Sequence, residues 1–359
     1  MSRPLDGVKV LDFSTLLPGP MATLILAEAG AEVTKVERPG RGEEMRSYEP
    51  RWGEDSVNFA LLNRGKTAIA LDLKAEDGRA EAMRRAREAD VLVEGFRPGV
   101  MDRLGLGYTA VAAQNPRIVY CSISGYGQTG AKRDRAGHDL NYIGDTGLLS
   151  LSCGDPGHRV VPPALIADIA GGAYPAVMNV MFALRQREAT GAGCHLDVAM
   201  ADNLFPFMYW ALGDYAAAGI RRGNADALVT GGSPRYRLYD TRDGKILAAA
   251  PLEEKFWRAF CEASGLEAEL RDDARDPAAT GARVAESVGS RDAADWEPVL
   301  HAADCCCTIV KDVGEALDDP HFSERGVFSH GVTNEAGQRI PALPVPVAPS
   351  FRPDPGDLP

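Results

Sequence analysis

The sequence predicts an α/β protein, with a large part built on a mostly parallel β-sheet and a smaller α+β part after it. Short apolar strands alternate with helical segments as far as Ile123, and strands joined in this way pair in parallel through right-handed crossovers. Beyond Asn224 the pattern changes to a hairpin and amphipathic helices. The length of 359 residues also suits two domains of about 150 residues each.

A β-α-β unit opens the chain over residues 8–37, and Gly30 ends its helix, as glycine commonly does. Runs of apolar residues then continue to alternate with amphipathic segments. In chain order, the predicted elements are a strand at Val8–Phe13, a helix at Met21–Ala29, strands at Glu32–Val36 and Thr67–Leu73, a helix at Gly78–Ala89, a strand at Val91–Glu94, a short helix at Val100–Leu104 and a strand at Ile118–Ile123.

One long apolar helix is predicted over Ala164–Arg187. Apolar residues fall on nearly every face of it, which is typical of a buried helix. Its uncharged run, Ile169–Leu184, is too short and too rich in glycine to predict a membrane span.

The smaller part begins with a hairpin over Tyr236–Ala250 that turns at Asp243-Gly244, a dipeptide typical of such turns. Amphipathic helices are predicted over Glu253–Ser264 and Ala293–Ala302. The proline-rich tail from Ile340 to Pro359 is expected to run extended over the surface.

Composition and charge narrow the class of protein. The chain has 39 Lys and Arg against 51 Asp and Glu, a net charge of −12, which argues against nucleic acid or an anionic membrane as partner. Seven cysteines without a framework spacing are typical of reduced thiols. The first residues have no apolar signal core. We therefore expect a soluble cytoplasmic protein.

Two familiar kinds of site are not predicted. The first turn, Ser14–Pro20, has prolines where a dinucleotide motif has glycines, although Glu37 ends the second strand as a ribose-binding acid would. Cys305-Cys306-Cys307 lies near His301, but three adjacent thiols cannot all turn toward one metal ion. We expect no metal site.

Positive charge gathers near the predicted strand ends of the first hundred residues. This pattern fits either a solvated surface of mixed charge or a pocket for a phosphorylated ligand. The residues are Arg38, Arg41, Arg46, Arg51, Arg64, Lys66 and Arg97.

Three residues could carry catalysis, although each has an ordinary structural explanation. Asp168 is the only charged residue between Arg159 and Arg185. It is either a helix N-terminal acid, which the helix dipole favours, or a positioned base or nucleophile. His138 could equally be a hydrogen-bonded core histidine. Glu253 could be a first-turn helix acid.

Several segments closely resemble the family III CoA-transferases, a superfamily that also contains α-methylacyl-CoA racemase. The likeness continues to the late segments Asp319–Phe322 and Arg325–Phe328. It is carried by Pro4–Asp12, Val36–Gly40, Asn63–Lys66, Phe96–Val100 and Ser124–Gln128.

Within that superfamily, three segments resemble the racemases. Gly137–Tyr142 is similar to the segment that carries their catalytic histidine, which implies that His138 is catalytic. Ala167–Gly172 is similar to the segment that carries their catalytic aspartate, which implies the same for Asp168. Leu252–Phe256 resembles the segment whose glutamate supports the histidine, which implies Glu253. Gly231–Pro234 also looks more like the racemases than like the glycine-rich loop of transferases. Gly144 and Asp145 depart from the racemase pattern beside the acyl pocket.

The resemblance implies a Rossmann-like large domain and a small α+β domain, with two chains interlocked as a homodimer. It divides the chain into residues 1–200 plus about 325–359, a linker over 201–224, and a small domain over 225–324. The implied site lies at a subunit interface, with CoA phosphates near Arg38, Arg64, Lys66 and Arg97.

The implied function is a racemase that inverts the α-carbon of 2-methyl-branched acyl-CoA, using His138 and Asp168 as two bases. Backbone N–H groups at the start of the Asp168 helix would stabilise the enolate oxygen. CoA is part of the substrate, and no metal or redox cofactor is expected. The alternatives are a CoA-transferase with Asp168 as nucleophile and a non-catalytic CoA-binding protein.

Overall fold

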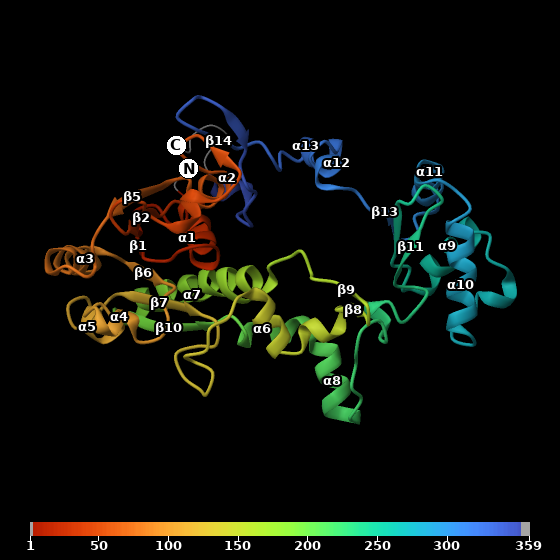
Figure 1. Cartoon of the computed structure of the whole chain (residues 1–359), viewed down its shortest axis with the longest axis horizontal. Coiled ribbons are helices and arrows are strands. Elements are labelled where there is room, and N and C mark those ends of the chain that lie inside the picture. Colours follow the sequence, from red (N-terminus) through yellow and green to blue (C-terminus); the bar gives the residue numbers. More distant parts are fainter. Residues whose placement is uncertain (1–2, 353–359) are drawn as a thin grey trace. The chain divides into compact units, whose positions relative to one another are not determined.

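A computed structural model describes residues 3–352, which form two compact units, each discontinuous in sequence (Figure 1). The first unit combines the N-terminal residues up to Thr146 with Pro163–Phe207 and the C-terminal segment from Pro320. The second combines Gly147–Pro162 with Met208–Asp319. Helix α8 (Tyr209–Ala218) occupies part of the segment expected to be a linker.

A six-stranded sheet forms the centre of the first unit, and all its strands are parallel, which confirms the predicted α/β class. The chain order reverses between β1 and β6, and ligands bind open α/β sheets at such a switch point. From one edge to the other, the strands are β10 (Cys194–Ala199), β7 (Val119–Ser124), β6 (Val91–Glu94), β1 (Lys9–Asp12), β2 (Glu32–Glu37) and β5 (Lys66–Ala70).

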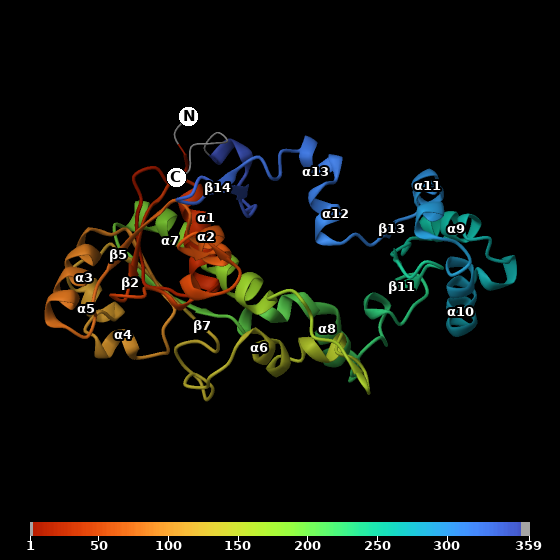
Figure 2. The same ribbon diagram turned by 45° about the horizontal axis from the view of Figure 1, so that its top comes forward.

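Helices cover both faces of this sheet (Figures 1 and 2). On one face, α1 (Pro18–Glu28) contacts α2 (Val57–Asn63) and α7 (Tyr174–Thr190). On the other, α3 (Glu76–Glu88), α4 (Val100–Arg103) and α5 (Tyr108–Ala112) share a buried core with the sheet. In-register side chains, among them Leu11, Leu92 and Tyr120, form the floor of that core.

The long apolar helix differs from its prediction in two ways. Residues Ala167–Ala173 form a π-helix, and α7 continues from it. The helix is also not buried on every face, because Met178 is 55% and Phe182 64% exposed. Ala167–Thr190 is long and apolar enough to cross a membrane by length and composition, contrary to expectation. In this structure α7 packs against α1, β7 and β10.

The second unit has its own core, built on a three-stranded antiparallel sheet. The predicted hairpin is present as β11 (Arg237–Asp240) and β12 (Ile246–Ala249), and β13 (Cys307–Ile309) pairs with β12. The buried rings of Trp257, Phe260 and Trp296 fill the core. Its helices are α9 (Glu254–Ala263), α10 (Pro277–Val288) and α11 (Ala293–Ala303), and α12 (Val313–Leu317) follows β13.

The C-terminal segment returns to the first unit. It comprises α13 (Pro320–Glu324) and an antiparallel pair, β14 (Gly331–Thr333) with β15 (Arg339–Pro341). Ala342 and Val345 are buried, and Arg352 Nε lies 2.7 Å from Glu28 Oε2 at the end of α1. The tail is therefore anchored as far as Arg352, and the rest of the predicted extended tail lies outside the described residues.

Candidate active site

Helix α6 (Asp139–Asp145) begins immediately after His138. The His138 N–H donates a 3.0 Å hydrogen bond to Asn141 Oδ1, and the Asn141 N–H donates to the His138 carbonyl at 2.8 Å. His138 is exposed on the surface of the first unit. These reciprocal bonds close the first turn and fix the backbone of His138.

Asp139 brings the start of α6 beside Asp168. Its buried carboxylate oxygen Oδ1 accepts hydrogen bonds from Ala167 N (2.7 Å) and Asp168 N (3.0 Å), at the beginning of the π-helix. His138 and Asp168, predicted 30 positions apart in the sequence, therefore belong to one local cluster. Sequence reasoning missed Asp139, for which the available signal was an acid directly after the candidate histidine.

This contact bears on the expectation that N–H groups at the start of the Asp168 helix stabilise the enolate oxygen. Two of those groups, the N–H of Ala167 and that of Asp168, already donate to Asp139, and the expectation stays a prediction. A π-helix is frequently found at functional sites, and here it places Asp168 in its first turn. Gly171 and Gly172 lie in the same π-helix, and close packing requires a glycine at each, because a Cβ at either position would press on Met200.

Asp168 has a perturbed pKa. Burial of the half-buried carboxyl and, after it, the negative charge of Asp139 together raise its pKa to about 6, and His138 opposes the shift. A group with this pKa is available in both protonation states near neutral pH, as proton exchange requires. Perturbed acids of this kind gather at functional sites.

Glu253 belongs to the second unit, where it precedes α9 and is exposed. Its carbonyl oxygen accepts the N–H groups of Phe256 and Trp257, so it begins the helix as predicted. Its support of His138 stays a prediction. Among residues 3–352, no group of three or more His, Cys, Asp or Glu is arranged to hold a metal ion.

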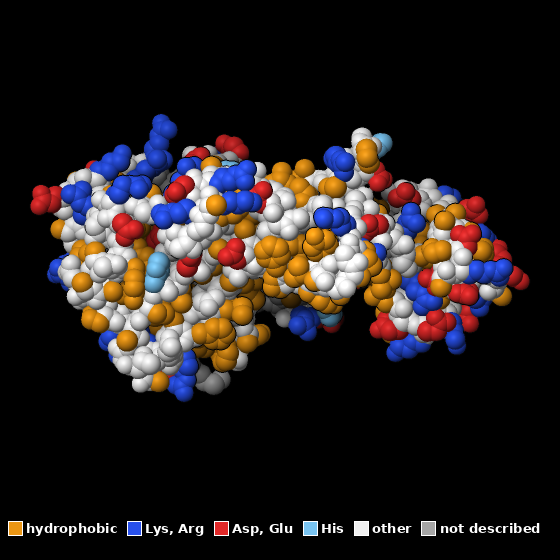
Figure 3. All heavy atoms as spheres, turned by 90° about the horizontal axis from the view of Figure 1, so that it is seen from below, with side chains coloured by type: hydrophobic (Ala, Val, Ile, Leu, Met, Phe, Trp, Pro, Cys, Tyr) orange, Lys and Arg blue, Asp and Glu red, His pale blue; other side chains and the backbone are white. Residues whose placement is uncertain are grey.

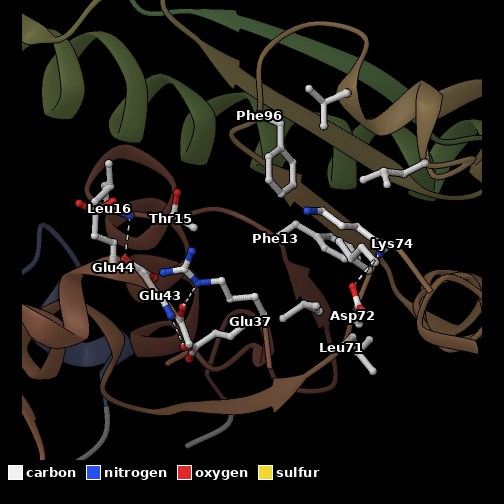
Figure 4. Close-up of a pocket in the computed structure, with 16 residues that line it drawn as sticks. Phe13, Thr15, Leu16, Glu37, Glu43, Glu44, Leu71, Asp72, Lys74 and Phe96 are labelled. Atoms are coloured by element: carbon white, nitrogen blue, oxygen red, sulfur yellow. Dashed lines mark hydrogen bonds between the residues drawn. The ribbon is translucent and has the colours of Figure 1, made fainter. Parts of the chain in front are cut away.

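A cavity of about 480 Å³ opens at the carboxyl ends of β1, β2, β5 and β6, by the switch point (Figure 4). Its walls are largely apolar. Phe13 and Phe96 lie on one side of it, and Leu16 and Glu43 lie on the other. The further apolar lining residues are Val36, Leu71, Leu73, Val100 and Leu104.

Beside it lies a smaller cavity of about 270 Å³ with a basic lining, to which Arg38, Arg41 and Arg46 contribute. Arg38 lines both cavities. Arg46 is bound to Glu37 and Asp55 at 2.7 Å each. Within residues 3–352 the Arg38 side chain makes a single hydrogen bond, which it donates to the Gly42 carbonyl at 2.7 Å. Arg38 and Arg41 are therefore the cations available to a ligand here.

Buried ions shape the wall of the large cavity. Lys35 Nζ lies 2.6 Å from Glu43 Oε2 and donates to the Ser14 carbonyl at 2.9 Å. Glu43 Oε1 accepts the N–H of Leu16, which has a φ of 64°. Such a backbone is strained for leucine, so the ion pair holds the turn in place. Nothing in the local sequence marked Lys35 as part of a site.

Arg64 and Lys66 do not line either cavity. Arg64 is 2% exposed in its side chain and lies 2.7 Å from Glu28, and it donates to the Leu343 carbonyl at 2.6 Å. Lys66 donates to the Pro20 carbonyl and to Asn63 at 2.9 Å each, and burial lowers its pKa to about 7. Both side chains stabilise the fold in this structure.

Arg64→Met should therefore reduce stability and leave CoA affinity unchanged. It would leave Glu28 with one buried partner fewer, so we expect the free energy of unfolding to fall by about 3 kcal/mol, measured by denaturant titration. Arg84→Met, which removes exposed ion pairs to Glu81 and Glu88, is the control and should change it by less than about 0.5 kcal/mol. Weaker CoA binding at unchanged stability would restore Arg64 to the site.

Arg97 lines a third cavity, of about 250 Å³, together with Glu94, Ser122 and His195. Its carbonyl accepts the N–H of Val100 at 3.1 Å, but its side chain has no hydrogen bond or ion pair with the residues from 3 to 352. Its charge opposes the rise that burial causes in the pKa of Tyr142 in α6. The structure thus places Arg38 and Arg97 in different cavities and does not bring the four predicted cations together.

Comparisons with known proteins point to one family. A sequence model of CoA-transferase family III matches residues 5–356. An acetyl-CoA:oxalate CoA-transferase from Acetobacter aceti is 33% identical, over 96% of this chain and 89% of its own. An alpha-methylacyl-CoA racemase from Homo sapiens is 32% identical, over 98% and 90%. The crystal structure of a CaiB/BaiF family protein from Brucella suis has a TM-score of 0.81 at 28% identity, covering 97% of this chain and 94% of its own.

Proposed function

Because this chain belongs to CoA-transferase family III, a family of enzymes, we propose that it is a racemase of 2-methyl-branched acyl-CoA thioesters. The observation that supports this most is that Asp139, the residue after His138, binds the N–H groups of Ala167 and Asp168 and so brings the chain at His138 close to that at Asp168. A racemase needs two groups that each exchange a proton, whereas a transferase needs only the nucleophile.

In the proposed reaction, one base removes the proton from the carbon next to the thioester carbonyl, and the C–H electron pair forms an enolate. The other group returns a proton to the opposite face, which inverts the carbon. His138 and Asp168 exchange these roles between the two directions. The raised pKa of Asp168, about 6, suits this use because the group can be both acid and base near neutral pH.

CoA is proposed to bind in the two neighbouring cavities. The apolar walls around Phe13 and Phe96 suit an aromatic base, and the basic cavity at Arg38 and Arg41 suits phosphate groups. A site at the switch point of a parallel sheet is the usual place for such a ligand. CoA enters as part of the substrate, and no separate cofactor is needed for proton transfer.

Reversing the charge at Arg38 should weaken CoA binding. For Arg38→Glu we expect the Kd of CoA to rise about tenfold to a hundredfold, because a charge-assisted hydrogen bond to phosphate is lost, with a weaker salt dependence measured by calorimetry. Arg97→Glu, tested in parallel, decides whether the third cavity also faces CoA. An unchanged Kd in both variants would contradict the proposal that the CoA phosphates bind at these cavities.

A CoA-transferase that uses Asp168 as nucleophile is the second candidate, supported by the 33% identity to a transferase. One experiment separates the two. The protein is incubated with a 2-methylacyl-CoA in deuterated water, with and without an acceptor acid. Deuterium entering the α-carbon without acceptor supports the racemase, whereas acyl exchange that depends on the acceptor, without deuterium entry, supports the transferase.

Exposed apolar side chains support the further proposal that the enzyme is a homodimer. In the first unit, Met178 and Phe182 of α7 are exposed, and in the second unit Tyr209, Leu212 and Tyr215 of α8 are each at least half exposed. Hydrophobic side chains gather in patches on the face that Figure 3 shows. Apolar patches of this kind are typical of subunit interfaces.

A further inference from the structure

We infer that Tyr142 is a positioning residue for His138, an assignment that rests on the proposed proton transfer. Its side chain is buried, and its hydroxyl donates a 2.6 Å hydrogen bond to the carbonyl oxygen of Gly137. Gly137 is the residue immediately before His138, so this bond holds the peptide unit that carries the imidazole.

Two glycines make room for the Tyr142 ring. A Cβ on Gly137 would lie 2.8 Å from Tyr142 Cε1, and a Cβ on Gly125 would lie closer still. Neither glycine has the left-handed backbone that favours glycine. The ring, and not the backbone, therefore excludes a side chain at both positions, and it is held in a notch between β7 and the loop before α6.

The hydroxyl also lies within the electrostatic field of the site. Burial raises the pKa of Tyr142, the charge of Asp168 raises it further, and Arg97 opposes the shift. The phenol therefore stays protonated at neutral pH and remains a donor to Gly137. Among residues 3–352, the hydrogen bond of this hydroxyl is the one to Gly137.

The two bases are held by different restraints. The peptide before His138 is held by Tyr142, and its own N–H by Asn141. The backbone of Asp168 is held by Asp139 and the π-helix. Loss of the Tyr142 hydroxyl should therefore displace His138 more than Asp168. Because each enantiomer loses its α-proton to a different one of these residues, the two exchange rates measure the two displacements separately.

The test measures α-proton exchange in deuterated water from each enantiomer of a 2-methylacyl-CoA. His138→Ala first identifies the enantiomer whose proton goes to His138. For Tyr142→Phe, exchange from that enantiomer should fall about tenfold, whereas exchange from the other should stay within about threefold and KM within about twofold. A general defect of folding would lower both equally.

Tyr120→Phe is the matched control, because it removes a buried tyrosine hydrogen bond of the same kind, to the Leu106 carbonyl at 3.0 Å. In Tyr120→Phe, α-proton exchange from one enantiomer should not fall more than exchange from the other. Gly125→Ala keeps the hydroxyl but displaces the ring, and it should reproduce the selective loss. Thermal unfolding confirms that each variant is folded.

If Tyr142→Phe exchanges the α-proton of both enantiomers at the wild-type rate, or if a folded variant loses exchange equally from both, the assignment of Tyr142 is overturned. The racemase proposal would remain intact. A wild-type protein that transfers CoA but exchanges no α-proton would overturn the proposed function itself, and with it any positioning of a catalytic His138.

Discussion

Replacement of His138 by Ala is expected to abolish racemisation from both enantiomers, with a loss of about 10³-fold or more. Either direction needs one group to remove the α-proton and another to return one. Exchange of the α-proton with solvent should nevertheless survive from one enantiomer, through Asp168. The measurement follows chirality and deuterium content of the acyl group in the same samples.

Asp168→Ala should also abolish racemisation, but α-proton exchange should then be retained only from the enantiomer whose proton goes to His138. Glu253→Ala should cause a milder loss of about tenfold, because its proposed role is only to orient the imidazole. The Glu253 variant serves as the graded comparison, since it alters neither base.

A transferase would give a different pattern. His138→Ala would then be tolerated, while Asp168→Ala would stop transfer of CoA to an acceptor acid. Racemisation that continued at the wild-type rate in His138→Ala would contradict the assignment of His138 and the racemase proposal together.

The second large effect is expected at Asp139, through the pKa of Asp168. The negative charge of Asp139 helps to raise that pKa to about 6. Asp139→Asn keeps an oxygen for the N–H groups of Ala167 and Asp168 but removes the charge, so the pKa of Asp168 should fall toward its ordinary value of 3.8.

The pH effect is the same in both directions, because the equilibrium between the two enantiomers does not depend on pH and both active forms of the site share one proton between His138 and Asp168. Below the pKa of Asp168 the site holds one proton too many, so kcat/KM for racemisation in the wild type rises with pH through about 6. In Asp139→Asn this acid limb should move to lower pH, by as many pH units as the pKa of Asp168 falls.

Asp139→Ala should be more severe, with a loss of about 100-fold in both directions, because the two N–H groups lose their acceptor and Asp168 loses its position. Asp145→Asn is the control, since it removes one charge from the other end of α6, where Asp145 binds Tyr126, Lys132 and Arg135. It should leave the pH limb in place. A limb that does not move in Asp139→Asn would separate Asp139 from the titration of Asp168.

Much of the fold could be predicted from local patterns. The strands at Val8–Phe13 and Val91–Glu94 and the hairpin at Asp243-Gly244 lie close to β1, β6 and the β11–β12 turn. The helix predicted over Ala164–Arg187 is present as the π-helix and α7, but the prediction that it is buried was wrong for part of its surface. Its even distribution of apolar residues indicated burial, yet Met178 and Phe182 are exposed, because hydrophobicity alone does not show which surface will cover a side chain.

The sequence by itself determined the α/β class, the order of the elements and the isolation of Asp168 as the only charge between Arg159 and Arg185, since these depend on residues close together in the chain. Only the tertiary structure decided that Arg64 and Lys66 are buried with partners while Arg38 faces a cavity. It alone joined Asp139 to Asp168 and seated Tyr142 between Gly125 and Gly137. The physical reason is that each of these contacts joins a side chain to atoms of another segment of the chain. Local periodicity predicts helices and strands but does not encode which segments meet in the folded protein.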